Sequence, residues 1–292
     1  MPTDVRDKQP CEVRANAVDG TAATKSFYDR HGWTERDGKT LDAVLFGTRE
    51  DGPIRQALYR VHVQRVRQAL LSAGKKLNLL ECGCGGNPAI HLLDLCRAYT
   101  GVDFSTTGLE MAAAKLRDAA LAVSLQEADL CALPFGDNTF DAAYCAHVMY
   151  HITEPAAQEK AFREILRVIR PGGVAVFLVA NSRPLLFPVR LARRLVADTP
   201  VLSAIANRLR PKPPLPYRPM PLTWMRGRLT KLGSVSVQTA GLPSKWFNQR
   251  VTEHRGVGGL VWKVISWIDR HHPILSAYLG NYLQITVRKG ER

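Results

Sequence analysis

The chain has 292 residues, of which 46% are hydrophobic and 23% are charged, and its formal net charge is +14. This length suits one large α/β domain with additions and is short for two independent enzyme domains. The composition excludes intrinsic disorder as the default, and the apolar runs are far shorter than the ~20 residues that a membrane-spanning helix needs.

Residues 1–75 are expected to form an arm and helices that could close over a site as a lid. Residues 1–24 have few large apolar side chains, which predicts a loose arm, and the first 20 lack the apolar stretch of a secretory signal. We therefore expect a cytoplasmic protein. Residues 26–52 mix turn formers and charges with aromatic residues, which predicts irregular structure that could cover a site. The aromatic residues that would hold this segment are Phe27, Tyr28 and Trp33.

An amphipathic helix is expected to begin at Pro53 and to end near Gly74, because apolar side chains recur every three to five residues between them. Short apolar runs then alternate with helical segments. The expected strands are residues 77–81, 98–104, 123–128, 140–145 and 174–180. The expected helices are residues 89–97, 107–119 and 154–169, the last ended by the turn Pro171-Gly172-Gly173.

Alternating strands and helices indicate parallel strands joined by right-handed helical crossovers. In an open parallel sheet, ligands bind beyond the carboxyl ends of the strands. We therefore expect residues 76–180 to form a ligand-binding core, with its candidate site residues directly after each strand.

The first of these turns has the sequence ECGCGGNP and begins at Glu81. Gly83 and Gly85 allow the backbone to turn sharply and to approach a ligand closely. Glu81 suits a cationic ligand better than a pyrophosphate, and Pro88 stands where a dinucleotide-binding loop needs a small residue. Alternatively, Glu81 could anchor the loop by accepting backbone N–H groups.

The next two turns each carry a carboxylate. Asp103 lies 22 residues after Glu81 and can accept both hydroxyls of a ribose, a feature that NAD enzymes share. Asp129 can accept a hydrogen bond from an exocyclic amine such as the adenine N6, although it could merely cap the turn that follows it. Phe104 and Leu130 could hold a purine between apolar faces.

Six cysteines are present, at positions 11, 82, 84, 96, 131 and 145. They show neither paired CxxC motifs nor zinc-type spacing, so we expect reduced thiols and no metal site. The C-x-C pair at Cys82 and Cys84 could bind a soft metal, but a glycine turn needs small side chains there in any case.

Four segments in order and at matching spacing resemble the class I S-adenosylmethionine-dependent methyltransferase family, in its small-molecule branch. They lie between residues 78 and 181 and read ECGCGG, GVDFS, EADLCALPFGDNTFDAAYCAHVMYHI and EILRVIRPGGVAVFLVAN. The resemblance implies a Rossmann-like, doubly wound and mostly parallel seven-stranded sheet with helices on both faces and an antiparallel last strand. Residues 234–239 and 282–287 are candidates for its end.

The resemblance also implies S-adenosylmethionine as the cofactor. The implied contacts are Glu81, Gly83 and Gly85 around the methionine part, Asp103 on the ribose, and Asp129 and Leu130 on the adenine. The chain departs from the family pattern at Gly86-Asn87-Pro88, where the family tolerates variation.

Methyl transfer from a sulfonium requires positioning of the acceptor and, for an oxygen acceptor, a base that takes its proton. His147 and His151 follow the fourth strand, one helical turn apart, and are the catalytic candidates. The family frequently keeps a histidine at the second position for packing, so His151 could be structural, with His147 facing the substrate. No Asn/Asp-Pro-Pro-Tyr/Phe motif follows that strand, which argues against N-methylation of DNA.

The basic character of the chain belongs to its C-terminal part. Residues 181–232 carry 11 basic side chains and 1 acidic one, whereas residues 1–180 carry 21 and 22. This proline-rich insertion is expected to form a substrate cap. It contains a basic amphipathic helix at residues 188–196, which could lie on an anionic membrane or cover the domain core. Its basic face would present Arg190, Arg193 and Arg194.

Residues 233–292 are expected to complete the sheet and to include a hydrophobic helix. Trp262 and Trp267 in this helix could line a hydrophobic pocket, sit at a bilayer interface or pack against the sheet. The first two uses favour an apolar substrate.

The leading hypothesis is O- or C-methylation of a hydrophobic or lipid-linked small molecule or secondary metabolite. The expected partners are that substrate and an anionic membrane surface. An RNA methyltransferase is the alternative that the basic insertion alone supports, since its arginines could contact phosphates. A non-catalytic cofactor-binding or membrane-adapter protein of the same fold is the alternative from another class.

Overall fold

The computed structural model describes residues 20–33, 35–36, 39–40, 53–182, 216–241, 247, 251–254 and 256–291. The helix predicted at residues 188–196 lies outside this part of the chain, as do most of the arm and of the basic insertion. None of the described helices is long and apolar enough to span a membrane.

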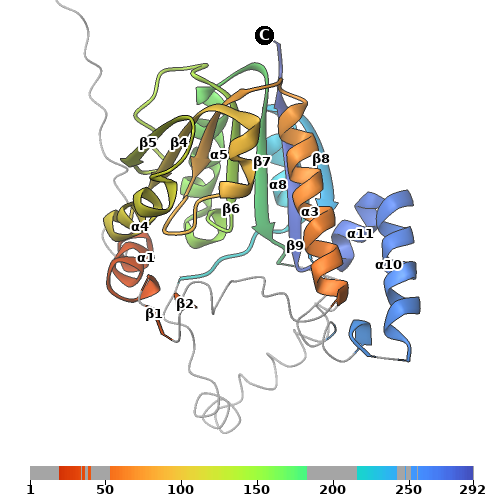
Figure 1. The fold of residues 1–292 in the computed structure, drawn as a ribbon. Helices are drawn as coiled ribbons and strands as arrows, with labels where there is room; N and C mark the ends of the chain where they lie inside the picture. The colour runs from red at the N-terminus through yellow and green to blue at the C-terminus, as the bar shows by residue number, and fades with distance from the viewer. Residues whose placement is uncertain are drawn as a thin grey trace, which may run out of the picture.

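A seven-stranded sheet forms the centre of the molecule (Figure 1). Its strands in chain order are β3 (Leu77–Cys82), β4 (Cys96–Asp103), β5 (Ala122–Glu127), β6 (Phe140–Ala146), β7 (Ile169–Ala180), β8 (Gly233–Thr239) and β9 (Tyr282–Lys289). In space their order is β5-β4-β3-β6-β7-β9-β8. Neighbours from β5 to β7 are parallel, and β9 is antiparallel to both β7 and β8. The predicted fold class, including the antiparallel last strand, is confirmed.

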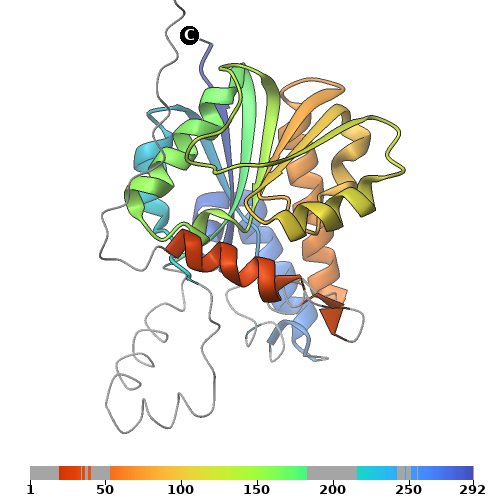
Figure 2. The same ribbon diagram turned by 90° about the vertical axis from the view of Figure 1, so that its left-hand side faces the viewer.

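Helices cover both faces of this sheet (Figures 1 and 2). Three of them contribute buried side chains to one hydrophobic cluster: α3 (Pro53–Leu71), the 3₁₀ helix η2 (Ile90–Leu95) and α4 (Thr106–Leu116). Those of the other are the 3₁₀ turn η3 (Met149–His151), α5 (Pro155–Val168), α8 (Leu222–Leu229) and α11 (Pro273–Leu279). The helix α10 (Gly258–His271) packs on α11 and forms the margin of the molecule (Figure 1).

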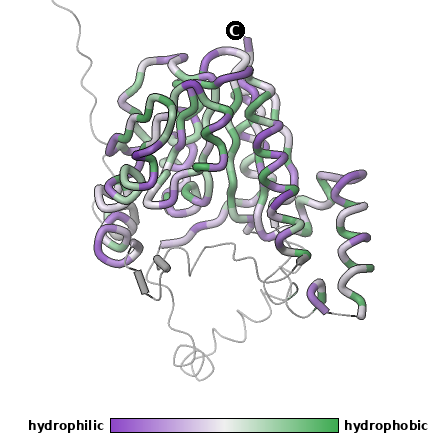
Figure 3. The backbone as a smooth tube through the Cα atoms, in the orientation of Figure 1, coloured by the Kyte–Doolittle hydropathy of each residue, from purple (hydrophilic) through white to green (hydrophobic). Residues whose placement is uncertain are grey.

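The burial of each strand follows its place in the sheet. The last eight residues of β7 are all buried, as expected for a strand covered on both faces, and its tube is green along most of its length (Figure 3). At the edge of the sheet, β8 alternates between exposed and partly or fully buried residues. Its sequence GSVSVQT has the matching alternation of polar and apolar side chains.

The N-terminal segment is more regular than its composition predicts. The predicted loose arm and irregular stretch include a helix, α1 (Gly20–Phe27), which continues into one π-helical turn, η1 (Tyr28–Gly32). A short hairpin follows, made of β1 (Glu35–Arg36) and β2 (Lys39–Thr40). Phe27 and Trp33 are buried against the rest of the protein. Tertiary packing of these aromatic side chains, which local propensity does not register, stabilises the helix.

Two predictions inside the core need correction. The helix expected at residues 89–97 is only the short η2, because Cys96 and Arg97 already belong to β4. The turn expected at residues 171–173 lies within β7, which begins at Ile169. The register of its pairing with β6 shifts there, because Phe140 pairs with Ile169 and Ala142 pairs with Val174. The extra residues of β7 form a bulge, and the strand pairs with β6 before and after it.

This bulge yields a matched pair of glycine substitutions. Gly172 has φ +72°, and a Cβ added there would meet open space. Gly172→Ala should therefore lower the unfolding free energy by only about 1 kcal/mol, because alanine disfavours a left-handed backbone. At Gly173 a Cβ would lie 2.6 Å from the carbonyl oxygen of Asp141, so Gly173→Ala should cost about 3 kcal/mol. Urea denaturation of the two variants measures the difference. Equal losses of unfolding free energy would contradict the assigned packing.

Candidate functional site

The loop after β3 is built around two glycines with left-handed backbone. Gly83 has φ +75° and Gly85 has φ +46°. A Cβ at Gly83 would lie 2.1 Å from the side chain of Val148, and one at Gly85 would lie 2.4 Å from the indole of Trp33. Both the backbone conformation and the close contacts therefore require glycine at these positions.

Asp103 ties this loop to the end of β4. Its Oδ2 accepts the N–H of Gly85 at 2.9 Å, and its Oδ1 accepts the N–H of Ser105 at 2.9 Å. The side chain is buried, and desolvation raises its pKa to about 6 although these backbone hydrogen bonds oppose the shift. A carboxylate has about four lone-pair sites, so Asp103 keeps acceptor capacity for a ligand beside its backbone hydrogen bonds.

Glu81 is buried in the floor of the loop. Its Oε2 accepts the hydroxyl of Tyr99 at 2.6 Å and the N–H of Ala89 at 2.9 Å. Burial raises its pKa to about 7. These contacts are those of the alternative in which Glu81 anchors the loop, and they join the end of β3 to β4 and to the start of η2.

The third turn lies at the same edge of the sheet, because Asp103 pairs in register with Glu127 at the end of β5. Asp129 is exposed, and its Oδ1 accepts the N–H of Cys131 at 2.8 Å. This is the geometry of the turn-capping alternative. Leu130 is buried and Phe104 is half-buried, so both apolar side chains follow strand ends beside Asp103.

The N-terminal segment covers this edge, which sequence reasoning anticipated only as a possible lid. The indole of Trp33 lies against Gly85 and Gly86 and donates its N–H to the hydroxyl of Ser105 at 3.1 Å. Ser105 in turn donates to Asp29 at 2.7 Å. The signal for this contact was the cluster of aromatic residues at positions 27, 28 and 33.

Lys25 was not recognised from the sequence. Its ammonium donates to the backbone oxygen of Phe104 and to Glu127. It therefore joins the N-terminal helix α1 to the ends of β4 and β5. A lysine in a polar segment has no sequence pattern that marks such a contact.

His147 follows β6 with an unusual backbone. Its φ is +64°, and its N–H donates to the carbonyl oxygen of Leu178 at 2.9 Å. The residue precedes η3, so His147 and His151 do not lie on one helix. Its Nδ1 is buried and has no hydrogen-bond partner in the described part of the chain. Burial, with a smaller contribution from His151, lowers its pKa to about 4, so the imidazole is neutral at pH 7.

His151 is held by a backbone contact. Its Nδ1 lies 2.9 Å from the carbonyl oxygen of Pro216, which can only accept, so Nδ1 carries the proton in this contact. Burial lowers its pKa to about 4. The geometry is that of a residue that fixes the chain around Pro216, as the packing alternative expects.

Six ring-bearing residues from distant parts of the chain meet beside the glycine loop, and we call them the aromatic cluster. They are Tyr28, His147, Tyr150, His151, Tyr217 and Tyr282. The His147 ring lies 5.1 Å from that of Tyr282, and the Tyr150 ring lies 4.6 Å from that of His151 and 5.1 Å from that of Tyr217. Sequence reasoning missed Tyr217 and Tyr282, which lie 67 and 132 positions after Tyr150.

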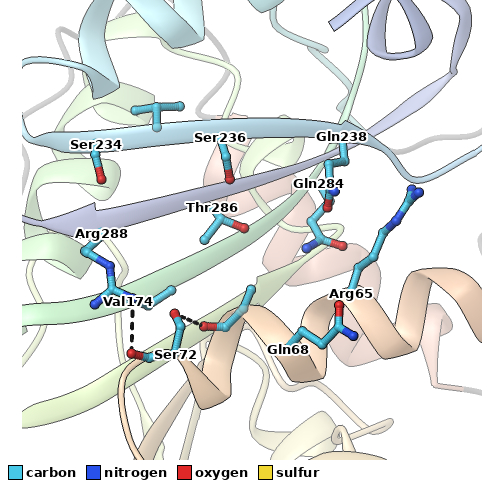
Figure 4. A pocket seen from close by; sticks show the side chains of 12 residues that line it. Arg65, Gln68, Ser72, Val174, Ser234, Ser236, Gln238, Gln284, Thr286 and Arg288 are labelled. Carbon is cyan, nitrogen blue, oxygen red and sulfur yellow. Dashed lines mark hydrogen bonds between the residues drawn. The ribbon is translucent and has the colours of Figure 1, made fainter. Parts of the chain in front are cut away.

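A separate cavity of about 540 Å³ lies between α3 and the strands β8 and β9 (Figure 4). Its lining is mostly polar and includes Ser236, Gln284 and Arg288. None of the predicted site residues lines it. The cavity is therefore distinct from the site at the carboxyl ends of the strands.

Comparison with known proteins identifies the central segment. A family model described as a methyltransferase domain matches residues 80–177. Methyltransferase GfsG of Streptomyces halstedii is 34% identical over 125 residues, which are 41% of this chain and 43% of that protein. The chain carries a class I methyltransferase domain. S-adenosylmethionine is the cofactor of this domain class.

Two further relatives describe the extent of the likeness. The ubiquinone/menaquinone biosynthesis C-methyltransferase UbiE of Yersinia enterocolitica is 38% identical over 92 residues, 31% of this chain and 35% of that protein. The chain thus matches less than half the length of either curated relative. The structure of N-methyltransferase NodS from Bradyrhizobium japonicum, in complex with S-adenosylhomocysteine, superposes with a TM-score of 0.55 at 16% identity, over 91% of this chain and 98% of that one. This structural likeness concerns the fold.

The geometry of the loop fits this cofactor. Gly85 and Gly86 present a surface without Cβ atoms, and the flat indole of Trp33 already lies on it. The buried carboxylate of Asp103 borders the same surface, with acceptor capacity for hydroxyl groups. A backbone that a ligand can approach closely, beside an acceptor for hydroxyl groups, suits the methionine part and the ribose of this cofactor.

The raised pKa of Glu81 predicts a pH dependence of stability. A carboxyl group whose pKa is higher in the folded protein contributes stability below its unfolded pKa and loses it as pH rises through the folded value. For Glu81 the loss runs from about pH 4.5 to about pH 7. Glu81→Gln keeps an oxygen for Tyr99 and Ala89 but cannot ionise, so its unfolding free energy should decline less over this range. Urea denaturation at several pH values tests this, and identical slopes in both proteins would contradict it.

Proposed function

We propose that this chain is an S-adenosylmethionine-dependent methyltransferase that methylates oxygen or carbon of a hydrophobic or lipid-linked small molecule. The observation that carries the proposal is the position of the aromatic cluster beside the glycine loop. Val148 touches Gly83 from the segment that bears His147 and His151. Tyr28 contacts both His151 and Trp33, and Trp33 lies on the loop.

The residues around the glycine loop have distinct roles in this proposal. Asp103 accepts the ribose hydroxyls, and Gly83 and Gly85 let the methionine part approach the backbone. Asp129 uses a carboxylate oxygen for the adenine amine, with Phe104 and Leu130 on the two faces of the ring. Glu81 acts indirectly, by fixing the loop through Ala89 and Tyr99.

When bound, S-adenosylmethionine supplies the electrophilic methyl group. The chain's own contribution is to position the acceptor and to take its proton where the acceptor is a hydroxyl. His147 is the candidate for the second task, because its Nδ1 has no partner among the described residues. Its lowered pKa leaves the ring neutral and able to accept a proton but makes it a weak base until the surroundings change. His151 positions the chain at Pro216 and packs the cluster.

The aromatic cluster favours an apolar or aromatic acceptor, since its rings offer edges and faces but few charges. The relative that is named a C-methyltransferase of ubiquinone/menaquinone biosynthesis supports an acceptor of this type. A prenylated quinone precursor and an aromatic secondary metabolite both have the required chemistry. Mass spectrometry of extracts incubated with deuteriomethyl-labelled cofactor would identify the acceptor, and label found only in RNA would contradict the proposal.

Asp103→Asn should weaken the binding of S-adenosylhomocysteine by roughly 10- to 100-fold, because charged hydrogen bonds to ligand hydroxyls are lost. In the wild type, affinity should also fall as pH drops below about 6, where Asp103 becomes protonated, and the variant should lack this dependence. Calorimetry measures both effects.

Asp94→Asn is the matched control, because Asp94 is an exposed carboxylate paired with Arg67 on the outer face of η2. It should leave the affinity unchanged. If a folded Asp103→Asn variant binds as tightly as the wild type, the proposed contact with the ribose is wrong.

His147→Asn should lower turnover by ~10²–10⁴ if the acceptor is a hydroxyl, while affinity for S-adenosylhomocysteine is retained. Asparagine tolerates the left-handed backbone at this position, so the substitution removes the base without adding strain. His151→Asn should instead lower the unfolding free energy and leave the turnover of the folded protein largely unchanged. Full activity of His147→Asn would assign that histidine to packing and favour methylation of carbon.

A further inference from the structure

The helices α10 and α11, with the turn before α10, expose an unusual amount of apolar side chain. Seven of the eleven large hydrophobic residues that are exposed in the described part of the chain lie within the 22 residues 257–278. We call these seven the apolar patch: Val257, Leu260, Val264, Trp267, Ile274, Leu275 and Tyr278. Large exposed apolar patches are uncommon on monomeric proteins and indicate an interaction site.

Four residues of the patch lie on one face of α10 and the turn before it. Val257, Leu260, Val264 and Trp267 are spaced by three, four and three residues, which places them within roughly 80° around the helix axis. Trp267 is 55% exposed and Leu260 is 68% exposed, so this face is turned toward solvent. The opposite face carries Asp269, which is buried toward α3 and α11.

Cations border the apolar face. Lys263 and Arg270 are both exposed and lie together on one flank of it, since seven residues are about two helical turns. His271 and His272 follow at the end of the helix, and the ring of His271 stacks on Trp267 at 4.9 Å. The only acidic residue between positions 257 and 279 is Asp269.

Asp269 adds no negative charge to this surface. It forms an ion pair with Arg65 of α3 and accepts the hydroxyl of Ser276 at 2.8 Å. Arg65 also donates to the carbonyl oxygen of Thr239 at the end of β8. This network fixes α10 and α11 to the body of the protein, so the exposed surface offers only apolar and basic or neutral groups to a partner.

We propose that this surface binds an anionic lipid bilayer, with the apolar patch inserted at the level of the headgroups and Lys263 and Arg270 on the acidic lipids. An interfacial helix has this combination of an apolar face that bears tryptophan and flanking lysine or arginine. A second copy of the chain fits the charge less well, because self-association would bring the cations of two helices together. Nucleic acid offers phosphates but nothing to cover seven apolar side chains.

The surface adjoins the candidate site. Asn181, directly after β7, donates to the carbonyl oxygens of Ala277 and Gly280 at 3.2 and 3.1 Å. The C-terminal end of α11 therefore lies at the carboxyl end of β7, where β9 begins with Tyr282 of the aromatic cluster. Attachment through α10 would hold this edge of the sheet near the membrane. The proposal concerns attachment only and does not depend on methyl transfer.

The test is co-flotation of the full chain with vesicles of phosphatidylcholine, with or without about one-third phosphatidylglycerol. The wild type should bind the anionic vesicles and bind them less in high salt. The double variant Lys263→Gln with Arg270→Gln should lower the partition coefficient roughly 30-fold, because each lost charge removes about 1 kcal/mol of attraction to the acidic lipids. Leu260→Ser with Trp267→Ser should lower it at least tenfold, through the loss of inserted apolar surface.

Matched controls change similar residues elsewhere. Ile90→Ser removes an exposed apolar side chain from η2, and Arg117→Gln with Lys160→Gln removes two exposed cations near α4 and on α5. These variants should bind as the wild type does. Circular dichroism and thermal unfolding verify that all variants are folded.

Two results would overturn the proposal. Binding that the α10 variants leave unchanged would place any membrane contact on another part of the chain. Absence of vesicle binding, together with a dimer in light scattering that Trp267→Ser dissociates, would assign the patch to self-association.

Discussion

The candidate site depends on one buried carboxylate that joins two turns of the chain by hydrogen bonds. Asp103 accepts the N–H of Gly85 on one oxygen and that of Ser105 on the other. Without these bonds, the glycine loop and the turn after β4 would each leave a backbone donor unpaired in the interior. The charge remains costly in this surrounding, as its raised pKa indicates. A hydroxyl-bearing ligand would lower that cost by adding donors to the remaining lone pairs.

The N-terminal segment and the segment after β6 both contact the glycine loop. Trp33 lies against Gly85 and Gly86, and Val148 contacts Gly83. The cavity between α3 and β8 has no part in it, since its lining consists of other residues. The surface at the strand ends is therefore covered in part by Trp33, outside residues 80–177, and in part by Val148, inside them.

The sequence predicted the core well because its signals there are local. Short strands of apolar residues, glycines before a helix and carboxylates after strands are short-range patterns, and they predicted the parallel core. The seven strands and the antiparallel last strand were instead implied by the resemblance to the methyltransferase family. The errors have physical reasons. The α1 helix forms because Phe27 and Trp33 are buried against distant residues, and the β7 bulge exists because pairing with β6 continues past Pro171. The contacts of Lys25 and Tyr282 depend on chain folding, which local patterns do not encode.

The order of strands has a consequence for how the molecule reaches this state. β9 is the last strand of the chain, yet it lies inside the sheet, where it pairs with β7 on one side and β8 on the other. Because β8 has no other neighbour in the described sheet, it can join only after β9 has been made. The aromatic cluster likewise waits for Tyr282, 254 positions after Tyr28. Folding of the site thus depends on contacts of large sequence separation, and long-range closure of this kind is slow. Until that point, the edge of β7 is exposed on the nascent chain.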